Sequence, residues 1–233
     1  MKAFLLAAGL GTRLRPITDS IPKCMLRIGD RPLLDIWLDA LATTGVHEVL
    51  VNLHHFAPVV RAHVAARGGP PAVRLVEEPE LLGSAGTLLA NRGFVDGEEM
   101  FLAINADNLT DFDLRALIDA HRAGGAIATL SLFRSPRPWE CGVVEVKDSR
   151  VAGYVEKPAD PQSDLANAGM YAFHPSALDV IAGPPPKDIG HDLLPRLVGR
   201  ARAVPIGGCY FIDIGTPAAL ERARDEWQAR RAS

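Results

Sequence analysis

The sequence predicts an α/β fold: a Rossmann-like, mostly parallel sheet with helices on both faces, plus a small antiparallel hairpin portion. Short apolar runs alternate with segments of helical periodicity through residue 133, an order typical of parallel strands joined by helical crossovers. After residue 133, two apolar or alternating runs flank the turn at 147–150, a pattern typical of a hairpin. Hydrophobic residues make up 48% and charged residues 23% of the 233 residues, which excludes a disordered or fibrous chain.

The individual elements follow from these patterns in chain order. The apolar run 3–8 ends in a glycine loop, as a buried parallel strand does. Pro32 opens a helix whose apolar residues recur at helical spacing from Leu34 to Leu41, and Gly45 suits its end. The same reasoning predicts further strands at 48–52, 72–76, 100–105, 126–133, 142–146, 151–156, 169–173 and 210–212. It predicts further helices at 57–67, 84–90, 113–123, 189–198 and 217–231.

The domain organisation is predicted to be simple. No Ser/Gly-rich linker, internal repeat or low-complexity segment divides the chain. We therefore predict a single domain over residues 1–233, with an N-terminal part of about 1–133 and a C-terminal part of about 134–233.

Charge and cysteine content narrow the classes of partner and compartment. The formal net charge of -3 gives no reason to expect a nucleic-acid or membrane-surface partner. No apolar run approaches the roughly 18–20 residues of a membrane helix, and the run 3–8 is shorter than the roughly 7–15 residues of a signal segment. Cys24, Cys141 and Cys209 lack metal-ligand spacing, which favours thiols in a reducing compartment. We therefore expect a cytoplasmic protein; no oligomeric state is indicated.

The loop after the first predicted strand holds the strongest chemical signal. Gly9-Leu10-Gly11 is either an ordinary tight turn or a loop whose backbone amides approach a phosphate. A dinucleotide fingerprint would need a third glycine where Leu14 stands, and the Gly-Lys-Ser/Thr of a P-loop is absent. Arg13 and Lys23 flank a proline-braced loop, so they are either solvated cations or two fixed charges for a polyphosphate.

The chain from Gly9 onward resembles the sugar-1-phosphate nucleotidyltransferases, also called nucleotide-sugar pyrophosphorylases. The resemblance rests on Gly-x-Gly-Thr-Arg-Leu-x-Pro at 9–16 with Pro22-Lys23, and on motifs that follow in order along nearly the whole chain. Cys24 and Ala106 are the two departures, where the family frequently has proline and glycine. The later motifs are Leu-Gly-Ser-Ala-Gly-Thr at 82–87, Asn-Ala-Asp-Asn at 105–108, Glu-Lys-Pro at 156–158, Asn-Ala-Gly-Met-Tyr at 167–171 and Asp-Ile-Gly-Thr-Pro at 213–217.

The resemblance implies a function and a set of site residues. Small family members act on hexose, heptose, amino-sugar or cyclitol phosphates; mannose- and heptose-1-phosphate guanylyltransferases are the nearest in kind, and the 233 residues hold no repetitive β-helix extension. The implied catalytic residues are Arg13, Lys23 and Asp107, and the implied nucleotide-binding residues are Leu6, Ala8, Gly9, Gly11, Thr12, Arg13, Lys23, Glu78, Gly83 and Ser84. The implied sugar-phosphate-binding residues, beneath the hairpin portion, are Asn105, Gly142, Glu156, Lys157 and Asn167.

The expected chemistry joins a nucleoside triphosphate to a sugar-1-phosphate and releases pyrophosphate. A phosphate monoester has a second pKa near ~6, so it attacks as a dianion without a general base or a covalent nucleophile. Asp107 and Asp213 each stand at a predicted strand end, and two carboxylates with phosphate oxygens and water suit Mg²⁺. Each aspartate could instead form a turn or a helix cap. Lys157 is expected to hold the sugar phosphate, although a surface Lys-Glu pair is the simpler alternative.

The sequence also bears on the base of the nucleotide and on two other classes of protein. Guanine presents two adjacent hydrogen-bond donors that one carboxylate accepts, so Glu78 favours GTP as the substrate. UTP is the second candidate, followed by dTTP. Glu77 and Glu78 could instead both be solvated loop residues. A non-catalytic subunit that senses nucleotide sugars should have lost a charged site residue, and none is missing here. A nicotinamide oxidoreductase is disfavoured by Leu14.

Overall fold

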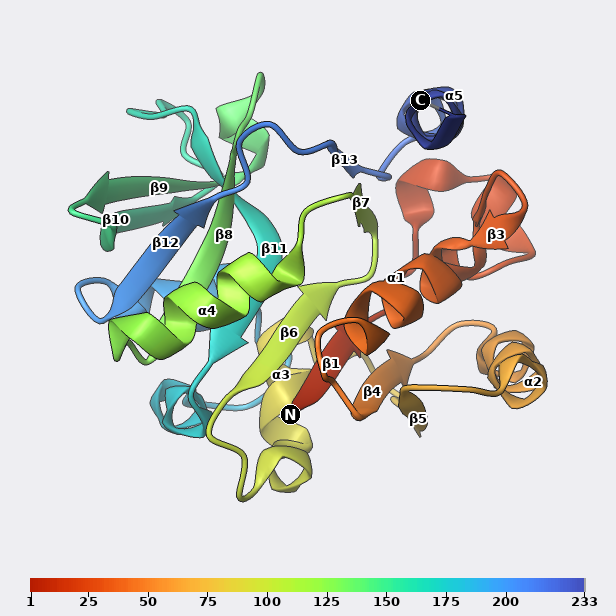
Figure 1. Cartoon of the computed structure of the whole chain (residues 1–233), viewed down its shortest axis with the longest axis horizontal. Helices are drawn as coiled ribbons and strands as arrows, with labels where there is room; N and C mark the ends of the chain where they lie inside the picture. Colours follow the sequence, from red (N-terminus) through yellow and green to blue (C-terminus); the bar gives the residue numbers. More distant parts are fainter. Residues whose placement is uncertain (233) are drawn as a thin grey trace.

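The computed structural model describes residues 1–232 and confirms an α/β fold (Figure 1). One nine-stranded sheet runs in the order β5-β4-β1-β6-β11-β8-β12-β10-β9. Its strands are β1 Lys2–Leu6, β4 Glu48–Leu53, β5 Ala72–Glu77, β6 Phe101–Asn105, β8 Ala128–Arg134, β9 Gly142–Lys147, β10 Arg150–Glu156, β11 Leu165–Phe173 and β12 Ala201–Pro205. Two short pairs add β2 Arg27–Ile28 with β3 Arg31–Pro32, and β7 Asn108–Thr110 with β13 Phe211–Asp213. The helices are α1 Leu33–Ala42, α2 Ala57–Arg67, α3 Ser84–Ala90, α4 Leu114–Gly124 and α5 Pro217–Ala232.

The N-terminal half of the sheet is parallel, as predicted. β1 pairs in parallel with both β4 and β6, and β4 pairs in parallel with β5. In this register Leu6 lies between Asn52 and Asn105, so the carboxyl ends of three strands meet at one edge. Ligands of open α/β sheets bind beyond the carboxyl ends of such strands. Leu6 and Asn105, two of the predicted site residues, therefore lie at this edge.

The C-terminal half is not parallel, and the prediction of a mostly parallel sheet with a separate small hairpin is wrong there. β11 enters antiparallel between β6 and β8, β12 pairs in parallel with β8, and β10 pairs antiparallel with β12 and β9. β9 then pairs with β11 through Ala166 and Val143, which closes a ring of five strands. The predicted hairpin is thus two strands of this ring. Local alternation of strands and helices does not encode such long-range antiparallel pairing.

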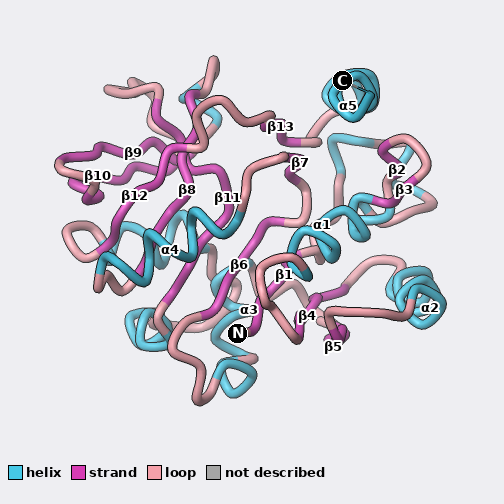
Figure 2. Tube along the Cα trace, in the orientation of Figure 1, coloured by secondary structure: helices cyan, strands magenta, loops and turns pink. Residues whose placement is uncertain are grey.

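Helices cover both faces of the sheet, which confirms that part of the prediction. Ala3 and Leu5 of β1 face one core together with α1, α4 and α5, whereas Phe4 faces a second core with α3. This alternation follows from the period of two along a strand. In Figures 1 and 2, α1 and α4 cross in front of the sheet and α3 lies behind it.

The predicted helix at 189–198 is the other local error. The chain forms a single wide turn at Ile189–Leu193 and then a 3-10 turn at Leu194–Leu197. Pro195 has no backbone N–H and its ring crowds the preceding turn, so an α-helix cannot run through it. Among residues 1–232, no helix combines the length and the apolar character required to span a bilayer.

We predict that Phe101→Ala lowers the free energy of unfolding by about 3–5 kcal/mol, because it opens a cavity among packed rings. Phe101 is fully buried, with ring centroids 5.6 Å from Phe4 and 5.7 Å from Phe173. Val146→Ala is the control, since Val146 is 37% exposed and its loss should cost less than about 0.5 kcal/mol. Urea unfolding measures both, and equal losses would contradict the packing described.

Candidate active site

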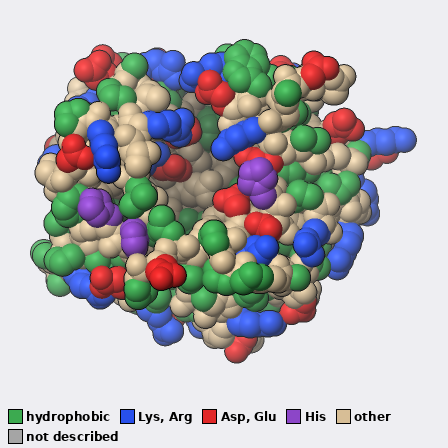
Figure 3. Space-filling view, turned by 180° about the vertical axis from the view of Figure 1, so that it is seen from behind, with side chains coloured by type: hydrophobic (Ala, Val, Ile, Leu, Met, Phe, Trp, Pro, Cys, Tyr) green, Lys and Arg blue, Asp and Glu red, His purple; other side chains and the backbone are tan. Residues whose placement is uncertain are grey.

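A cavity of about 330 Å³ opens at the carboxyl edge of the parallel strands. Seen from behind in Figure 3, the surface is hollowed near its centre, with acidic and basic side chains around the rim. The predicted site residues that line this cavity are Leu6, Ala8, Gly9, Lys23, Glu78, Gly83, Ser84, Asn105 and Asp107. We call this cavity, with the adjoining residues of the five-stranded ring, the cleft.

Lys23 stands at the centre of the cleft. Pro22 precedes the 3-10 turn Lys23–Met25, and the buried side chains of Cys24 and Met25 fix that turn in the core. The Lys23 Nζ lies 2.8 Å from Asp107 Oδ2 and 3.7 Å from Asp213 Oδ1. Its side chain is only 10% exposed. One largely buried ammonium therefore joins the two predicted metal ligands.

Asp107 and Asp213 are brought together by β7 and β13. The antiparallel register sets Asp213 opposite Asn108, and the Ile214 N–H donates to the Asp107 carbonyl at 3.0 Å. The pKa of Asp213 is raised from its ordinary value, first because the cleft walls partly remove the carboxyl from water and second because of the Asp107 charge. This desolvation acts although about half of the side chain remains open to solvent.

Arg13 reaches the same group from the glycine loop. A Cβ on Gly215 would lie 2.8 Å from Arg13 Nη2, so the absence of a side chain at 215 lets the guanidinium approach Asp213. Gly11 and Thr12 lie outside the cavity lining. Gly11 has a φ of +62° and its carbonyl accepts from Leu14 N and Thr18 Oγ1, so in this structure it forms a turn.

Glu78 lies in a buried polar network at one end of the cavity. Its Oε1 accepts from Asn52 Nδ2 at 2.9 Å and from Thr87 Oγ1 at 2.5 Å, and its Oε2 accepts from Leu82 N at 3.2 Å. Asn52 Oδ1 accepts in turn from the Ala7 N–H at 2.7 Å. The sequence analysis missed Asn52, which lines the cavity, because an asparagine within a predicted strand carries no distinguishing signal.

The motif at 82–87, which contains the predicted nucleotide-binding residues Gly83 and Ser84, is partly covered by a distant segment. The N–H groups of Ala85 and Gly86, at the start of α3, donate to the Lys187 carbonyl at 2.9 and 3.1 Å. Ser84 Oγ donates to Asp188 Oδ2 at 2.8 Å. Asp188 also lines the cavity and was missed, because it follows a proline-rich segment without a motif of its own.

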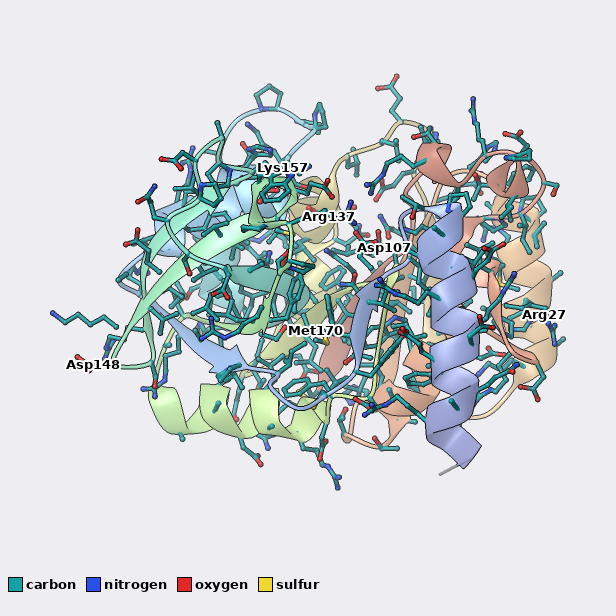
Figure 4. The ribbon with its side chains drawn as sticks, turned by 90° about the horizontal axis from the view of Figure 1, so that it is seen from above. Arg27, Asp107, Arg137, Asp148, Lys157 and Met170 are labelled. Carbon is teal, nitrogen blue, oxygen red and sulfur yellow. The ribbon has the colours of Figure 1, made fainter. Side chains whose placement is uncertain are left out.

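The five-stranded ring supplies the predicted sugar-phosphate residues other than Asn105. The Tyr154 hydroxyl donates to Glu156 Oε2 at 2.6 Å, and a Cβ on Gly142 or Gly190 would lie 2.7 or 2.4 Å from that same oxygen. Two glycines thus leave the space that the Glu156 carboxylate occupies. Lys157 follows directly, and in Figure 4 it lies on the ring side of the cleft, apart from Asp107.

Lys157 and Asn167 are held by the backbone of the ring. Lys157 adopts a φ of +47° while its N–H donates to the Cys141 carbonyl at 2.9 Å. Such a conformation costs a non-glycine residue on the order of 1 kcal/mol, and such strain is concentrated at functional sites. Asn167 donates to Tyr171 Oη at 2.6 Å and accepts from the Gly169 N–H, so its amide orientation is fixed.

The side chain of Asn105 lies close to the backbone of β11 at Gly169. Gly169 has a φ of +70°, and a Cβ there would lie 2.7 Å from Asn105 Nδ2. Glycine at 169 therefore lets β11 pass directly over the end of β6. The Asn105 side chain lines the cavity and makes no hydrogen bond to another of the described residues.

Known proteins resemble this chain in sequence and in fold. Residues 2–230 match the sequence model of the family described as Nucleotidyl transferase. The chain belongs to this family. It is 33% identical over 249 aligned positions to the UTP--glucose-1-phosphate uridylyltransferase of Synechocystis sp., with 99% of this chain covered. It is 32% identical over 224 aligned positions to the mannose-1-phosphate guanylyltransferase catalytic subunit beta of Danio rerio, with 93% of this chain covered.

The chain spans 63% and 62% of the lengths of these two nucleotidyl transferases. The fold is shared with a crystal structure of HddC from Yersinia pseudotuberculosis complexed with GMP-PN, at a TM-score of 0.81 and 24% identity. That match covers 97% of this chain and 99% of HddC.

We predict that Gly190→Ala displaces the Glu156 carboxylate and lowers the free energy of unfolding by about 1–3 kcal/mol, as other insertions into packed space do. Gly207→Ala is the matched control, because a Cβ at Gly207 meets no atom within 4 Å. Both glycines have backbone angles that alanine tolerates, so the comparison isolates the steric effect. Equal stability of the two variants in urea would show that the space beside Glu156 is not restricted.

Proposed function

We propose that this nucleotidyl transferase joins a nucleoside triphosphate to a sugar-1-phosphate, giving a nucleoside-diphosphate sugar and pyrophosphate. The observation that carries the proposal is the contact of Lys23 with Asp107 and Asp213. The two ends of the cleft are lined by different kinds of residues. The end beside Glu78 is lined by a buried polar network, which suits a base. The opposite end presents Glu156 and the strained Lys157.

In this reaction an oxygen of the sugar phosphate attacks the α-phosphorus, and the bond to the β-phosphate oxygen breaks. The leaving group is pyrophosphate, and no proton has to be removed from the attacking dianion. The residues must therefore align two anions and neutralise charge in the transition state. Lys23 and Arg13 are suited to the triphosphate, and Lys157 to the sugar phosphate.

Mg²⁺ fits the residues present at the centre of the cleft. Asp107 and Asp213 already share one cation, the Lys23 ammonium, and Asp188 adds a carboxylate to the same cavity as Asp107. Among residues 1–232, no three His, Cys, Asp or Glu side chains form a ready-made metal cage. Asp107 and Asp213 would hold the ion, which usually takes one or two carboxylates and leaves other positions for phosphate oxygens and water. When bound, Mg²⁺ supplies charge neutralisation between the two anionic substrates.

We further propose that the nucleotide is GTP, with Glu78 as the group that recognises the base. Glu78 lines the cavity, and its Oε2 accepts only one backbone hydrogen bond, which leaves acceptor capacity for one guanine donor. The HddC structure with GMP-PN and the guanylyltransferase of Danio rerio support this choice. The uridylyltransferase of Synechocystis is equally similar and supports UTP as the second candidate.

Pyrophosphate release tests the proposed reaction. The purified chain is mixed with Mg²⁺, each of the four nucleoside triphosphates and dTTP, and a panel of hexose, heptose, amino-sugar and cyclitol 1-phosphates. We expect one pyrophosphate per nucleotide sugar formed with at least one pair. If the chain binds nucleotide sugars but turns over none of the substrate pairs, it is instead a sensing subunit.

Asp107→Asn and Asp213→Asn should each lower kcat by at least about 10²-fold, because each removes charge from the proposed Mg²⁺ site. Excess chelator should abolish turnover of the unmodified chain. Asp179→Asn is the control, since Asp179 forms an exposed ion pair with Arg92 and neither residue lines the cavity. Full activity of either cleft variant, or activity in chelator, would contradict the metal assignment.

Lys23→Ala and Lys157→Ala should change different kinetic parameters. Lys23 is placed to act on the triphosphate in the transition state, so its loss should mainly lower kcat. Lys157 is placed on the sugar side, so its loss should mainly raise KM for the sugar phosphate. Steady-state kinetics with each substrate varied in turn separates the two effects, and the reverse pattern would mean that the substrates occupy each other's sites.

GTP should exceed UTP and dTTP in kcat/KM, and Glu78→Gln should reduce that preference because the amide NH2 that replaces one carboxylate oxygen is a donor and cannot accept from guanine. A tenfold or greater preference for UTP or dTTP would show that the base is assigned wrongly. A GTP preference unchanged in Glu78→Gln would show that another group recognises guanine. The urea midpoint of Glu78→Gln must be measured in parallel, since Glu78 bonds to Asn52 and Thr87.

A further inference from the structure

A second cavity, of about 570 Å³, lies at the opposite ends of the central strands. Its wall includes Met100 just before β6, Ile127 just before β8 and His174 just after β11. The cleft begins at Asn105, at the other end of β6. Five residues of extended strand separate the two cavities by roughly 17 Å. The second cavity is therefore distinct from the proposed active site.

The second cavity carries an excess of positive charge. Arg122, in the last turn of α4, and Arg200, just before β12, both line it and are exposed. Within residues 1–232, neither guanidinium makes a hydrogen bond or an ion pair. Glu99 is the one carboxylate in the wall. Two arginines without protein partners present forked donors that match the oxygens of a phosphate.

His121 adds a buried imidazole to the wall of this cavity. It is 6% exposed, and its Nδ1 lies 3.0 Å from the Thr129 hydroxyl. Burial, with a smaller effect of His174, lowers the pKa of His121 to about 4, so the ring is neutral near pH 7. When Nδ1 accepts from Thr129, the ring proton resides on Nε2.

The Nε2 of His121 belongs to a side chain that lines the second cavity. It makes no hydrogen bond to any of residues 1–232. Among these residues, the fully enclosed side-chain nitrogen and oxygen atoms without a partner are Tyr210 Oη and Trp227 Nε1, so His121 Nε2 is not sealed in the core. The cavity is the open space that His121 lines. A nine-tenths buried imidazole with an unused ring nitrogen thus lines the same cavity as the two arginines.

We propose that this second cavity binds a small phosphomonoester, with its phosphate held by Arg122 and Arg200 and by the Nε2–H of His121. Free phosphate has the same chemistry, but its size favours an organic part: 570 Å³ lies within the range of roughly 300–1,000 Å³ for small-molecule pockets. Glu99 is suited to accept hydroxyl groups of that organic part. Recognition here does not depend on the reaction proposed for the cleft.

Histidine NMR tests the proposal on the full chain. The protein is labelled with ¹³C at the histidine ε1 carbons, and the His121 and His174 signals are assigned by single substitutions. Glucose 6-phosphate, inorganic phosphate and glucose are titrated separately at constant ionic strength and pH. We expect saturable shifts of both signals with glucose 6-phosphate, at least tenfold weaker binding of inorganic phosphate, and no shift with glucose.

Arg122→Ala with Arg200→Ala should weaken glucose 6-phosphate binding at least tenfold, and Arg222→Ala should leave it unchanged. Arg222 is an exposed arginine of α5, on the far side of the molecule from the end of α4 (Figure 1). All three arginines are exposed, so the variants should keep the urea midpoint of the parent. Absent shifts, equal affinity for inorganic phosphate, or equal weakening by Arg222→Ala would each overturn the proposal. The reporters lie outside the cleft, so the result stands whether or not the chain transfers nucleotidyl groups.

Discussion

The ammonium of Lys23 is the group on which the arrangement of the cleft depends. It connects a proline-led turn near the N-terminus with Asp107, at the end of β6, and with Asp213, more than one hundred residues later. Without a cation the two carboxylates would repel each other, and the raised pKa of Asp213 reflects that repulsion together with partial removal from water. The fold thus keeps two like charges close by placing one lysine between them.

The sheet explains why these groups meet. Parallel register brings Leu6, Asn52 and Asn105 to one edge, and the five-stranded ring then supplies a second wall containing Glu156 and Lys157. The two halves approach closely because Gly169 has no side chain to strike Asn105. The pocket beside Glu78 and the wall with Glu156 and Lys157 therefore flank one centre of charge, an arrangement that suits the proposed transfer between two phosphates.

Much of this could be predicted from sequence, because the informative signals are local. Pro32 with its apolar spacing, the run 3–8 and the turn at 147–150 correspond to α1, β1 and the turn between β9 and β10. The motif residues Lys23 and Asp107 proved to be in contact. Long-range features could not be predicted. The antiparallel entry of β11, the closure of β9 onto β11 and the strand β12 depend on pairing between distant segments, and Asn52 and Asp188 reach the cavity only through that pairing.

A double-mutant cycle between Lys23 and Asp107 tests the central claim most directly, because it measures their interaction without assuming any reaction. The free energies of unfolding in urea are compared for the unmodified chain, Lys23→Met, Asp107→Asn and the double variant. We predict a coupling energy on the order of 1 kcal/mol, limited because the Asp107 side chain is 41% exposed, with the double variant more stable than the sum of the single losses implies. Additive losses, within about 0.3–0.5 kcal/mol, would contradict the claim that Lys23 holds these segments together.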